Sequence, residues 1–236
     1  MKLYAVKLCQ RLDPVLFQSL FLCVDKKKRD RINRFFNWQD AHRVLLADCL
    51  ARCVVIEETG LLNKDIRFTT NKFRKPELDG RPEFYFNLSH SGNWVVCAVD
   101  QMPVGVDIEK VKDFDPGIFN LCLTREEQDL LWRKKISDRR SFFFTLWTLK
   151  ESYLKALGCG LQIQPNACSV LFRSKGETRI TNNKKVDFDV FLKSYDIDND
   201  HKMAVSAFHD QFPVSVIRKE HESILQGLHI ETSREQ

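Results

Sequence analysis

The sequence has few of the residues that break or stiffen a chain, with 9 glycines and 7 prolines among 236 residues. Collagen-like and low-complexity proteins need far more of both, so this composition indicates a folded globular protein. No apolar run approaches the ~18 residues that a membrane-spanning helix requires, and we expect no membrane partner. The first residues are interrupted by Lys7 and lack a small-residue cleavage pattern, which argues against a secretion signal.

The eight cysteines include no Cys-x-x-Cys pair, which removes the commonest sign of a zinc or redox site. Cys49 and Cys53 are four residues apart, which is the spacing of a helix face, and no second pair completes a metal site. Most of the eight lie among leucine, valine or alanine, as small buried thiols do. Because disulfides are rare in the cytoplasm, we interpret all eight as reduced thiols of a cytoplasmic protein.

The excess of positive charge is small, since 37 lysine and arginine residues stand against 32 aspartate and glutamate residues. This balance suits a polyanionic ligand or an acidic protein partner. It is too slight to indicate nucleic acid binding, and no stripe of basic and aromatic residues adds to it. The basic run Lys26–Arg31, taken alone, is typical of a solvated surface.

Hydrophobic periodicity predicts two long helices. Apolar residues recur at steps of three and four from 32 to about 60, and again from 140 to 157, where Gly158 is a natural end. The segment Thr124–Glu127 has the form of a capping box and predicts a further helix start. Shorter apolar segments bounded by turn residues predict strands. These strands lie at 3–8, 66–68, 84–88, 94–99, 104–108, 169–172, 188–192 and 203–208.

Each half of the chain therefore holds a long helix and paired strands. The segment 94–100 is similar to the segment 202–208, which favours a duplication, although any two amphipathic strands share such a pattern. We predict an α+β fold of two similar lobes, 1–103 and 104–220, followed by a polar tail at 221–236. In such a fold the cleft between the lobes is the expected ligand site.

Asp107 and Glu109 form the most informative pattern in the sequence. In the predicted strand, side chains alternate between faces, so both carboxylates share one face with Cα atoms about 7 Å apart. Gly105 lies on the same face and leaves the neighbouring space open. Two close carboxylates repel unless one is protonated or a cation lies between them. Such an oxygen pair favours Mg²⁺ on an enzyme that handles phosphate, whereas a strand with solvated acids is the simpler alternative.

Trp147, Glu151 and Lys155 recur at steps of four in the second long helix and therefore share one face. Glu151 preceding Lys155 is the favourable order for a helical ion pair, which stabilises a helix by about 0.2–0.5 kcal/mol. An ordinary ion pair is thus one interpretation. Because this helix is apolar on most sides, the alternative is that both charges meet other groups inside the protein.

The polar segment 89–93 joins two of the predicted strands. Ser89 and His90 can donate hydrogen bonds to phosphate oxygens, and Gly92 lets the backbone come close to a ligand. A catalytic pair of Ser89 and His90 is disfavoured, because adjacent strand residues point apart. A plain hairpin turn is the remaining alternative, as a solvated charge is for the isolated Lys75.

Three segments together resemble the signature motifs of the surfactin-type 4′-phosphopantetheinyl transferases. They occur in the family's order and at its usual spacing, and the resemblance extends from Met1 to about Asp210. Any one segment is weak evidence, whereas three in register are specific. The segments are Phe86–Gly92 (FNLSHSG), Val104–Glu109 (VGVDIE) and Trp147–Lys155 (WTLKESYLK).

The resemblance implies two similar lobes with the active site at their junction, within one monomer. It implies an enzyme that moves the 4′-phosphopantetheine arm of coenzyme A to a serine of an apo peptidyl or acyl carrier protein and releases adenosine 3′,5′-bisphosphate. The implied cofactor is Mg²⁺, with Mn²⁺ as a substitute. Carriers of this kind serve nonribosomal peptide, polyketide or fatty-acid synthesis, including antibiotic biosynthesis.

The resemblance also implies individual roles. Asp107, Glu109 and Glu151 correspond to the magnesium ligands. Glu151 is also the candidate base, either directly or through a water molecule, and Lys155 corresponds to the lysine that holds the pyrophosphate. The residues implied to contact coenzyme A are Lys28, Arg31, Lys75, Ser89, His90 and Lys155.

Two further positions bear on substrate binding. Val44 departs from the family pattern, because relatives often have a threonine there that can reach coenzyme A. Residues 111–124 follow the metal strand directly and carry apolar side chains, such as Phe119, that we expect to be exposed. We expect this stretch to dock the carrier protein beside its serine.

Two other classes of protein share parts of the pattern. A metal-dependent nuclease would also use Asp107 and Glu109 with a nearby lysine, and it would bind nucleic acid. A non-catalytic module for acidic proteins would explain the excess of positive charge but not the three carboxylates. Loss of turnover without loss of coenzyme A binding in Glu151→Gln would distinguish the transferase from the binding module.

Overall fold

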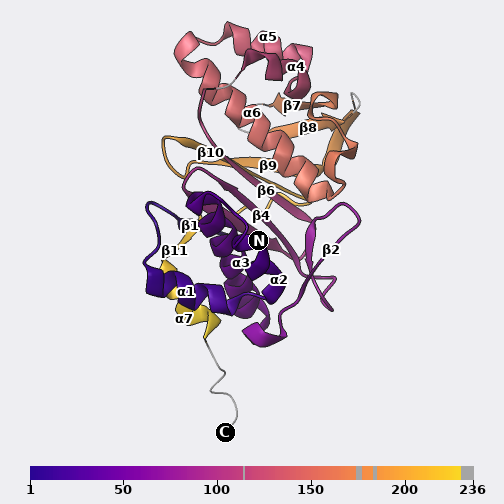
Figure 1. The fold of residues 1–236 in the computed structure, drawn as a ribbon. Helices are drawn as coiled ribbons and strands as arrows, with labels where there is room; N and C mark the ends of the chain where they lie inside the picture. The colour runs from indigo at the N-terminus through magenta and orange to yellow at the C-terminus, as the bar shows by residue number, and fades with distance from the viewer. Residues whose placement is uncertain (114, 174–176, 183–184, 230–236) are drawn as a thin grey trace.

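The computed structural model describes residues 1–113, 115–173, 177–182 and 185–229. Two α+β lobes lie one above the other in Figure 1, the lower one built mainly from the first half of the chain and the upper one from the second. The two-lobed α+β expectation is confirmed. In the described residues, no helix combines the length and the apolar character needed to cross a membrane.

The first lobe contains a four-stranded sheet in the order β11-β1-β5-β4, with helix α3 packed against it. Helix α3 begins after Asn37, whose side chain accepts a hydrogen bond from the Gln39 amide, and ends at Gly60 in the left-handed conformation. The elements are β1 (Lys2–Lys7), α1 (Pro14–Cys23), α2 (Lys26–Ile32), α3 (Trp38–Thr59), β2 (Phe68–Thr70), β3 (Pro76–Leu78), β4 (Tyr85–Ser91), β5 (Trp94–Asp100), β11 (Ile217–Lys219) and α7 (His221–Leu228).

The second lobe contains a five-stranded sheet in the order β6-β10-β9-β8-β7, and helix α6 crosses it. Helix α5 starts with the predicted capping box, in which Thr124 and Glu127 each bond the other's backbone amide. The elements are β6 (Val104–Lys110), α4 (Phe119–Cys122), α5 (Arg125–Arg133), α6 (Ile136–Leu157), β7 (Cys168–Phe172), β8 (Thr178–Asn182), β9 (Lys185–Tyr195) and β10 (His201–Ala207).

An apolar cluster joins the two lobes. Leu3 and Val96 from the first sheet pack with Val106 and Val205 from the second, and all four side chains are fully buried. The two lobes therefore share one core at their contact, which holds β4 and β6 next to each other.

Two sequence expectations differ from the structure. The first long helix begins at Trp38 rather than at 32, because residues 26–32 form the separate helix α2, which Asp25 caps. The polar tail expected from 221 is a helix up to 228, and Ile224 and Leu228 are buried in the core of the first lobe. Residues 217–219 also return to the first lobe, where β11 pairs with β1. Residues 230–236 lie outside the described residues.

Gly105 is the point at which helix α6 comes closest to the sheet. A Cβ atom at this position would lie 2.0 Å from the carbonyl oxygen of Ser152 and 2.4 Å from the amide nitrogen of Ala156. The expectation of open space beside Gly105 is therefore wrong, because the backbone of α6 fills that space. Only glycine permits this approach, which brings the side chains of α6 to those of β6.

We expect Gly105→Ala to destabilise the protein severely, because the added methyl group would clash with the backbone of α6 and neither α6 nor β6 can shift without loss of packing. An overpacking cost of about 3 kcal/mol corresponds to a fall in Tm of roughly 6–12 °C, measurable by thermal denaturation. Gly117→Ala is the matched control, because its Cβ would meet only the Asp115 side chain, at 3.3 Å. Equal melting temperatures for Gly105→Ala and the wild type would contradict this account of the α6 contact.

Candidate active site

Strands β4 and β6 lie at the junction of the lobes and belong to separate sheets. Three side chains of β4 connect them by accepting hydrogen bonds from backbone amides of β6, and we call Asn87, Ser89 and Ser91 the side-chain ladder. Its contacts advance in the same direction along both strands, so the strands run parallel. The bonds are Val106 N to Asn87 Oδ1 (2.8 Å), Ile108 N to Ser89 Oγ (3.4 Å) and Lys110 N to Ser91 Oγ (3.1 Å).

The two serines of the ladder also hold the two strand carboxylates. Ser89 Oγ donates to Asp107 Oδ1 at 2.9 Å, and Ser91 Oγ donates to Glu109 Oε2 at 2.6 Å. Lys155 from α6 donates to Asp107 Oδ1 at 2.5 Å and to Ser89 Oγ at 3.0 Å. The second oxygen of Asp107, Oδ2, is buried and has no hydrogen-bond partner in the described parts of the chain.

Helix α6 adds Glu151 to this group. Burial raises the pKa of Glu151 to about 7, and the nearby charges of Asp107 and Glu109 act in the same direction. Burial also raises the pKa of Glu109, against the opposing effect of its hydrogen bond from Ser91. Three carboxylates and one ammonium group thus share a partly buried space, and the carboxylates destabilise one another when ionised.

These residues fit a hard divalent cation. All the potential metal ligands are carboxylate oxygens, and the unpartnered Asp107 Oδ2 is an available ligand atom. A cation would stabilise the ionised carboxylates against the burial and the neighbouring negative charges that raise the pKa of Glu151. In the residues that the structure describes, no three acidic, histidine or cysteine side chains form a ready-made cage. Mg²⁺ does not require one, because it is usually held by one or two carboxylates with waters and a substrate phosphate.

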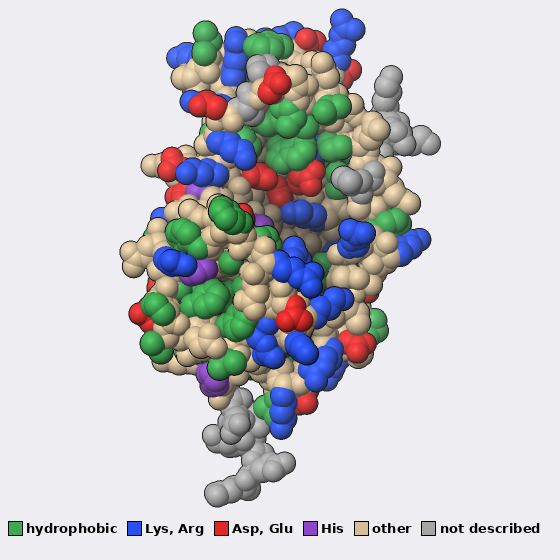
Figure 2. Space-filling model, viewed as in Figure 1, with side chains coloured by type: hydrophobic (Ala, Val, Ile, Leu, Met, Phe, Trp, Pro, Cys, Tyr) green, Lys and Arg blue, Asp and Glu red, His purple; other side chains and the backbone are tan. Residues whose placement is uncertain are grey.

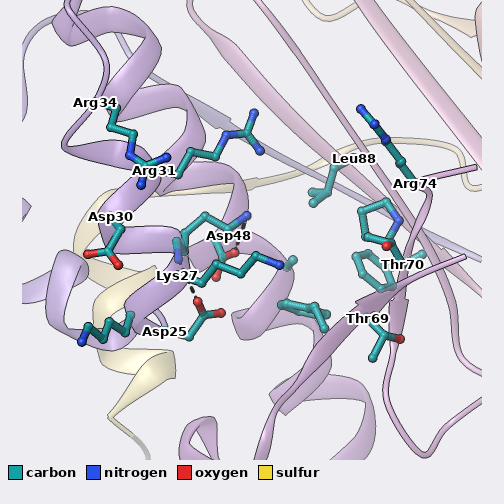
Figure 3. Close-up of a pocket in the computed structure, with 16 residues that line it drawn as sticks. Asp25, Lys27, Asp30, Arg31, Arg34, Asp48, Thr69, Thr70, Arg74 and Leu88 are labelled. Carbon is teal, nitrogen blue, oxygen red and sulfur yellow. Dashed lines mark hydrogen bonds and ion pairs between the residues drawn. The ribbon is translucent and has the colours of Figure 1, made fainter.

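A basic groove of about 1000 Å³ lies in the first lobe, next to this acidic group. Figure 3 shows Arg31 and Asp48 on its helical side and Thr69, Thr70 and Arg74 on its strand side. Figure 2 shows acidic side chains in the hollow between the lobes, with lysine and arginine side chains spread below them. The cations that line the groove are Lys26, Lys27, Lys28, Arg31, Arg34 and Arg74.

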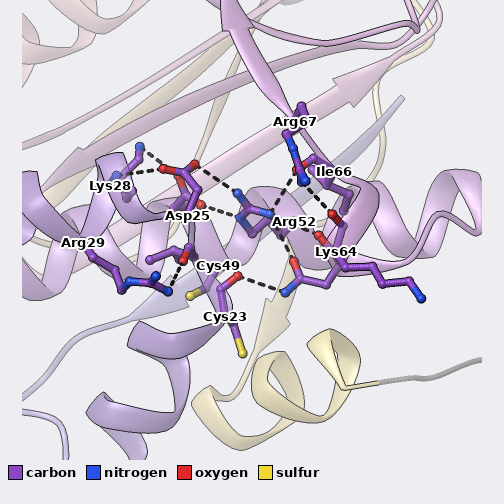
Figure 4. Close-up of polar contacts among 12 residues, drawn as sticks. Cys23, Asp25, Lys28, Arg29, Cys49, Arg52, Lys64, Ile66 and Arg67 are labelled. Atoms are coloured by element: carbon purple, nitrogen blue, oxygen red, sulfur yellow. Dashed lines mark hydrogen bonds and ion pairs between the residues drawn. The ribbon is translucent and has the colours of Figure 1, made fainter.

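A polar network around the buried Arg52 and Asp48 fixes the helical wall of the groove (Figure 4). Arg52 donates to Asp48 at 2.7 Å, and its guanidinium lies 3.3 Å from Asp25, which caps helix α2. Asp48 in turn pairs with Lys28 at 2.8 Å. Sequence reasoning missed Asp48 and Arg52. Their signal was a charged pair at a spacing of four on the apolar face of a helix.

The remaining expected coenzyme contacts lie in different places. Lys75 lines a separate cavity of about 430 Å³ and donates to the carbonyl oxygens of Lys155 (2.7 Å) and Val104 (3.0 Å), and burial lowers its pKa to about 8. It thereby ties the end of α6 to β6. His90 lies at the edge of the acidic group, where partial burial of its ring and the nearby Arg43 guanidinium lower its pKa. Val44 is buried in the first core.

Lys150 was also missed, although it adjoins Glu151. It is fully buried and forms an ion pair with Glu127, which in turn accepts a hydrogen bond from the Val170 amide at 2.8 Å. Lys150 also donates to the carbonyl oxygen of Cys122 at 2.8 Å. This pair fastens the segment that contains α4 and α5 to α6.

Two family models match the chain. One, described as the 4′-phosphopantetheinyl transferase superfamily, matches residues 103–206, and another, described as 4′-phosphopantetheinyl transferase, N-terminal, matches residues 13–102. The chain is 34% identical over 225 residues to the 4′-phosphopantetheinyl transferase Sfp of Bacillus subtilis (strain 168), which covers 95% of this chain and 100% of that protein.

Two further comparisons are more limited. The chain is 38% identical over 162 residues to the 4′-phosphopantetheinyl transferase gsp of Aneurinibacillus migulanus, which covers 69% of this chain and 68% of that protein. A crystal structure of a holo-(acyl-carrier-protein) synthase from Bacillus anthracis str. Ames in complex with CoA (3′,5′-ADP) matches at 19% identity and a TM-score of 0.39. It covers 44% of this chain and 93% of that one.

The raised pKa of Glu151 predicts a pH-dependent effect of Glu151→Gln on stability. The folded state binds the Glu151 proton more tightly than the unfolded state, so this group lowers the free energy of unfolding as pH rises from about 4.5 to 7. Glutamine cannot ionise, and we expect the variant to melt roughly 2–4 °C above the wild type at pH 8 without metal. The difference should vanish near pH 4.5. A variant less stable than the wild type at pH 8 would contradict this electrostatic account.

Proposed function

The chain belongs to the 4′-phosphopantetheinyl transferase superfamily, and we propose that it transfers the 4′-phosphopantetheine arm of coenzyme A to a serine of an apo carrier protein. The reaction releases adenosine 3′,5′-bisphosphate. The observation that carries this proposal is the meeting of Asp107, Glu109, Glu151 and Lys155 beside a basic groove. We further propose that the enzyme acts as a monomer in the cytoplasm.

The basic groove binds the nucleotide end of coenzyme A. Lys28 and Arg31 line it and supply positive charge for the 3′-phosphate, and the guanidinium of Arg31 can make paired hydrogen bonds to it. Phe68 and Phe86 provide apolar surface for the adenine in the same groove. From there the pyrophosphate reaches the junction of the lobes, where His90 is available as a hydrogen-bond donor and Ser89 donates by turning its proton from Asp107.

Asp107, Glu109 and Glu151 are the residues that would hold Mg²⁺. When bound, the cation supplies positive charge that stabilises the pyrophosphate oxygens as the phosphoanhydride breaks. Mn²⁺ would serve in its place, because it prefers the same oxygen ligands.

Side chains of the protein take up the proton of the carrier serine and balance the negative charge of the leaving group. The carrier serine attacks the β-phosphorus of coenzyme A, the bond from that phosphorus to the bridging oxygen breaks, and the bisphosphate leaves with that oxygen. Glu151 accepts the serine proton, either directly or through a water molecule. Lys155 turns from Asp107 to the pyrophosphate and balances the charge on the leaving group.

The carrier protein docks on the second lobe along residues 111–124. Within this stretch Phe119, Cys122 and Leu123 are buried, so the sequence expectation that Phe119 is an exposed contact is wrong. Leu121 is 69% exposed and is the better docking contact, and hydrophobic side chains gather above the acidic hollow in Figure 2. Phe114 lies outside the described residues. The carrier is a peptidyl or acyl carrier protein.

Intact-mass analysis of an apo peptidyl carrier protein tests the reaction. Incubation with the enzyme, coenzyme A and MgCl₂ should add the mass of one phosphopantetheine arm, and EDTA should prevent this gain. Asp107→Asn should slow transfer roughly 10²-fold or more, because a charge that stabilises the transition state is lost. Asp65→Asn, which changes an exposed acid of the first lobe, is the matched control. Bound coenzyme A without mass gain on peptidyl or acyl carriers would contradict the proposed activity.

A second test addresses docking. Leu121→Ala should raise the KM for the carrier about five- to tenfold, which is typical for removal of one well-packed interface side chain. The KM for coenzyme A should not change. Val15→Ala serves as the control, because Val15 is similarly exposed (75%) but lies on α1 of the first lobe. An equal rise in both KM values for Leu121→Ala would exclude this docking surface.

A further inference from the structure

Ser91 ends strand β4, and the turn that follows it is held by contacts on both of its sides. The next residue, Gly92, has a φ of +57°, and its carbonyl oxygen accepts a hydrogen bond from Arg43 at 2.7 Å. On the other side, a Cβ at Gly92 would lie 2.4 Å from the buried ring of His201, which Asp198 fixes through a 2.8 Å contact. The Ser91 backbone therefore has little freedom to move.

The Ser91 hydroxyl uses this fixed position to make two directional bonds. It accepts from the Lys110 amide at 3.1 Å, which leaves its single proton for Glu109 Oε2, at 2.6 Å. Glu109 has three rotatable bonds in its side chain, and a short hydrogen bond from a fixed donor selects one orientation. The other carboxylate oxygen, Oε1, is then free to face the space that Asp107 and Glu151 share.

The third member of the ladder provides a contrast. Asn87 accepts from the Val106 amide at 2.8 Å, and Val106 is an apolar residue of the shared core. Asn87 thus joins the two strands by the same kind of bond as Ser91 but acts on no carboxylate through it. The ladder separates two effects that can be measured independently, the joining of the lobes and the orientation of a ligand.

We infer that Ser91 is a positioning residue for the transfer reaction, because its hydroxyl orients Glu109 for the divalent cation. This inference rests on the proposed function, which makes Glu109 one of the residues that would hold the metal. Hydrogen bonds to a ligating carboxylate are part of the site, and their removal typically costs 10- to 100-fold in metal affinity. Ser91 acts through Glu109 and needs no contact with either substrate.

Titration with MgCl₂ at saturating coenzyme A, without carrier, tests the inference by thermal denaturation. In Ser91→Ala the Mg²⁺ concentration for half-maximal stabilisation should rise about tenfold, while the affinity for coenzyme A without metal stays the same. Ser91→Thr keeps the hydroxyl and should restore the wild-type midpoint. Ser91→Cys, with a weak thiol donor, should move the midpoint in the same direction as alanine and serves if the alanine variant does not fold.

Asn87→Ala is the matched control for a purely structural role. It should lower the melting temperature of the metal-free protein while its Mg²⁺ midpoint stays at the wild-type value. In the transfer assay, Ser91→Ala should regain most of its kcat at high Mg²⁺, because the defect lies in binding the cation.

A wild-type midpoint in Ser91→Ala, or an equal shift in Asn87→Ala, would overturn the inference and leave the proposed function intact. A wild-type protein that neither transfers the arm nor responds to Mg²⁺ would instead overturn the proposed function, and the inference with it.

Discussion

The rest of the active site depends on the contact between β4 and β6, two neighbouring strands that belong to different sheets. Side chains of Asn87, Ser89 and Ser91 supply the acceptors that a paired strand would otherwise provide. Because a serine hydroxyl also has a proton to donate, the side-chain ladder can bind carboxylates, which a ladder of backbone hydrogen bonds cannot do. It binds the lobes together and fixes the carboxylates of the second lobe with the same atoms.

The distribution of charge follows from this arrangement. The carboxylates lie where the lobes meet. Burial raises the pKa values of Glu109 and Glu151, and the charge of Asp107 acts in the same direction on both. The groove beside them is basic, with Lys28 balanced by the buried Asp48. Such a site suits a ligand that brings an anion and a divalent cation together. A metal-dependent nuclease would share the carboxylates, but this chain belongs to the 4′-phosphopantetheinyl transferase superfamily. A non-catalytic binding module would not require a partly buried group of three carboxylates.

Local patterns in the sequence predicted much of the site. Strand alternation placed Asp107 and Glu109 on one face of a strand, and helical spacing placed Glu151 and Lys155 on one face of the second long helix. The roles of all four residues came from the resemblance to a family. Contacts between distant segments had no local signal. The hydrogen bonds from Lys75 to the carbonyl oxygens of Val104 and Lys155, the pairing of Lys150 with Glu127, and the burial of Phe119 all depend on how α6 packs. Helix α7 was missed because only three apolar residues, Ile224, Leu225 and Leu228, mark its packed side in a polar segment.

Anomalous diffraction from crystals grown with MnCl₂ and coenzyme A would test the central claim most directly. The account predicts one manganese peak at the junction of the lobes, bonded to oxygens of Asp107, Glu109 and Glu151 and to the pyrophosphate, with the hydrogen bond from Ser91 to Glu109 retained. A peak remote from these carboxylates, or coenzyme A bound outside the basic groove, would contradict it.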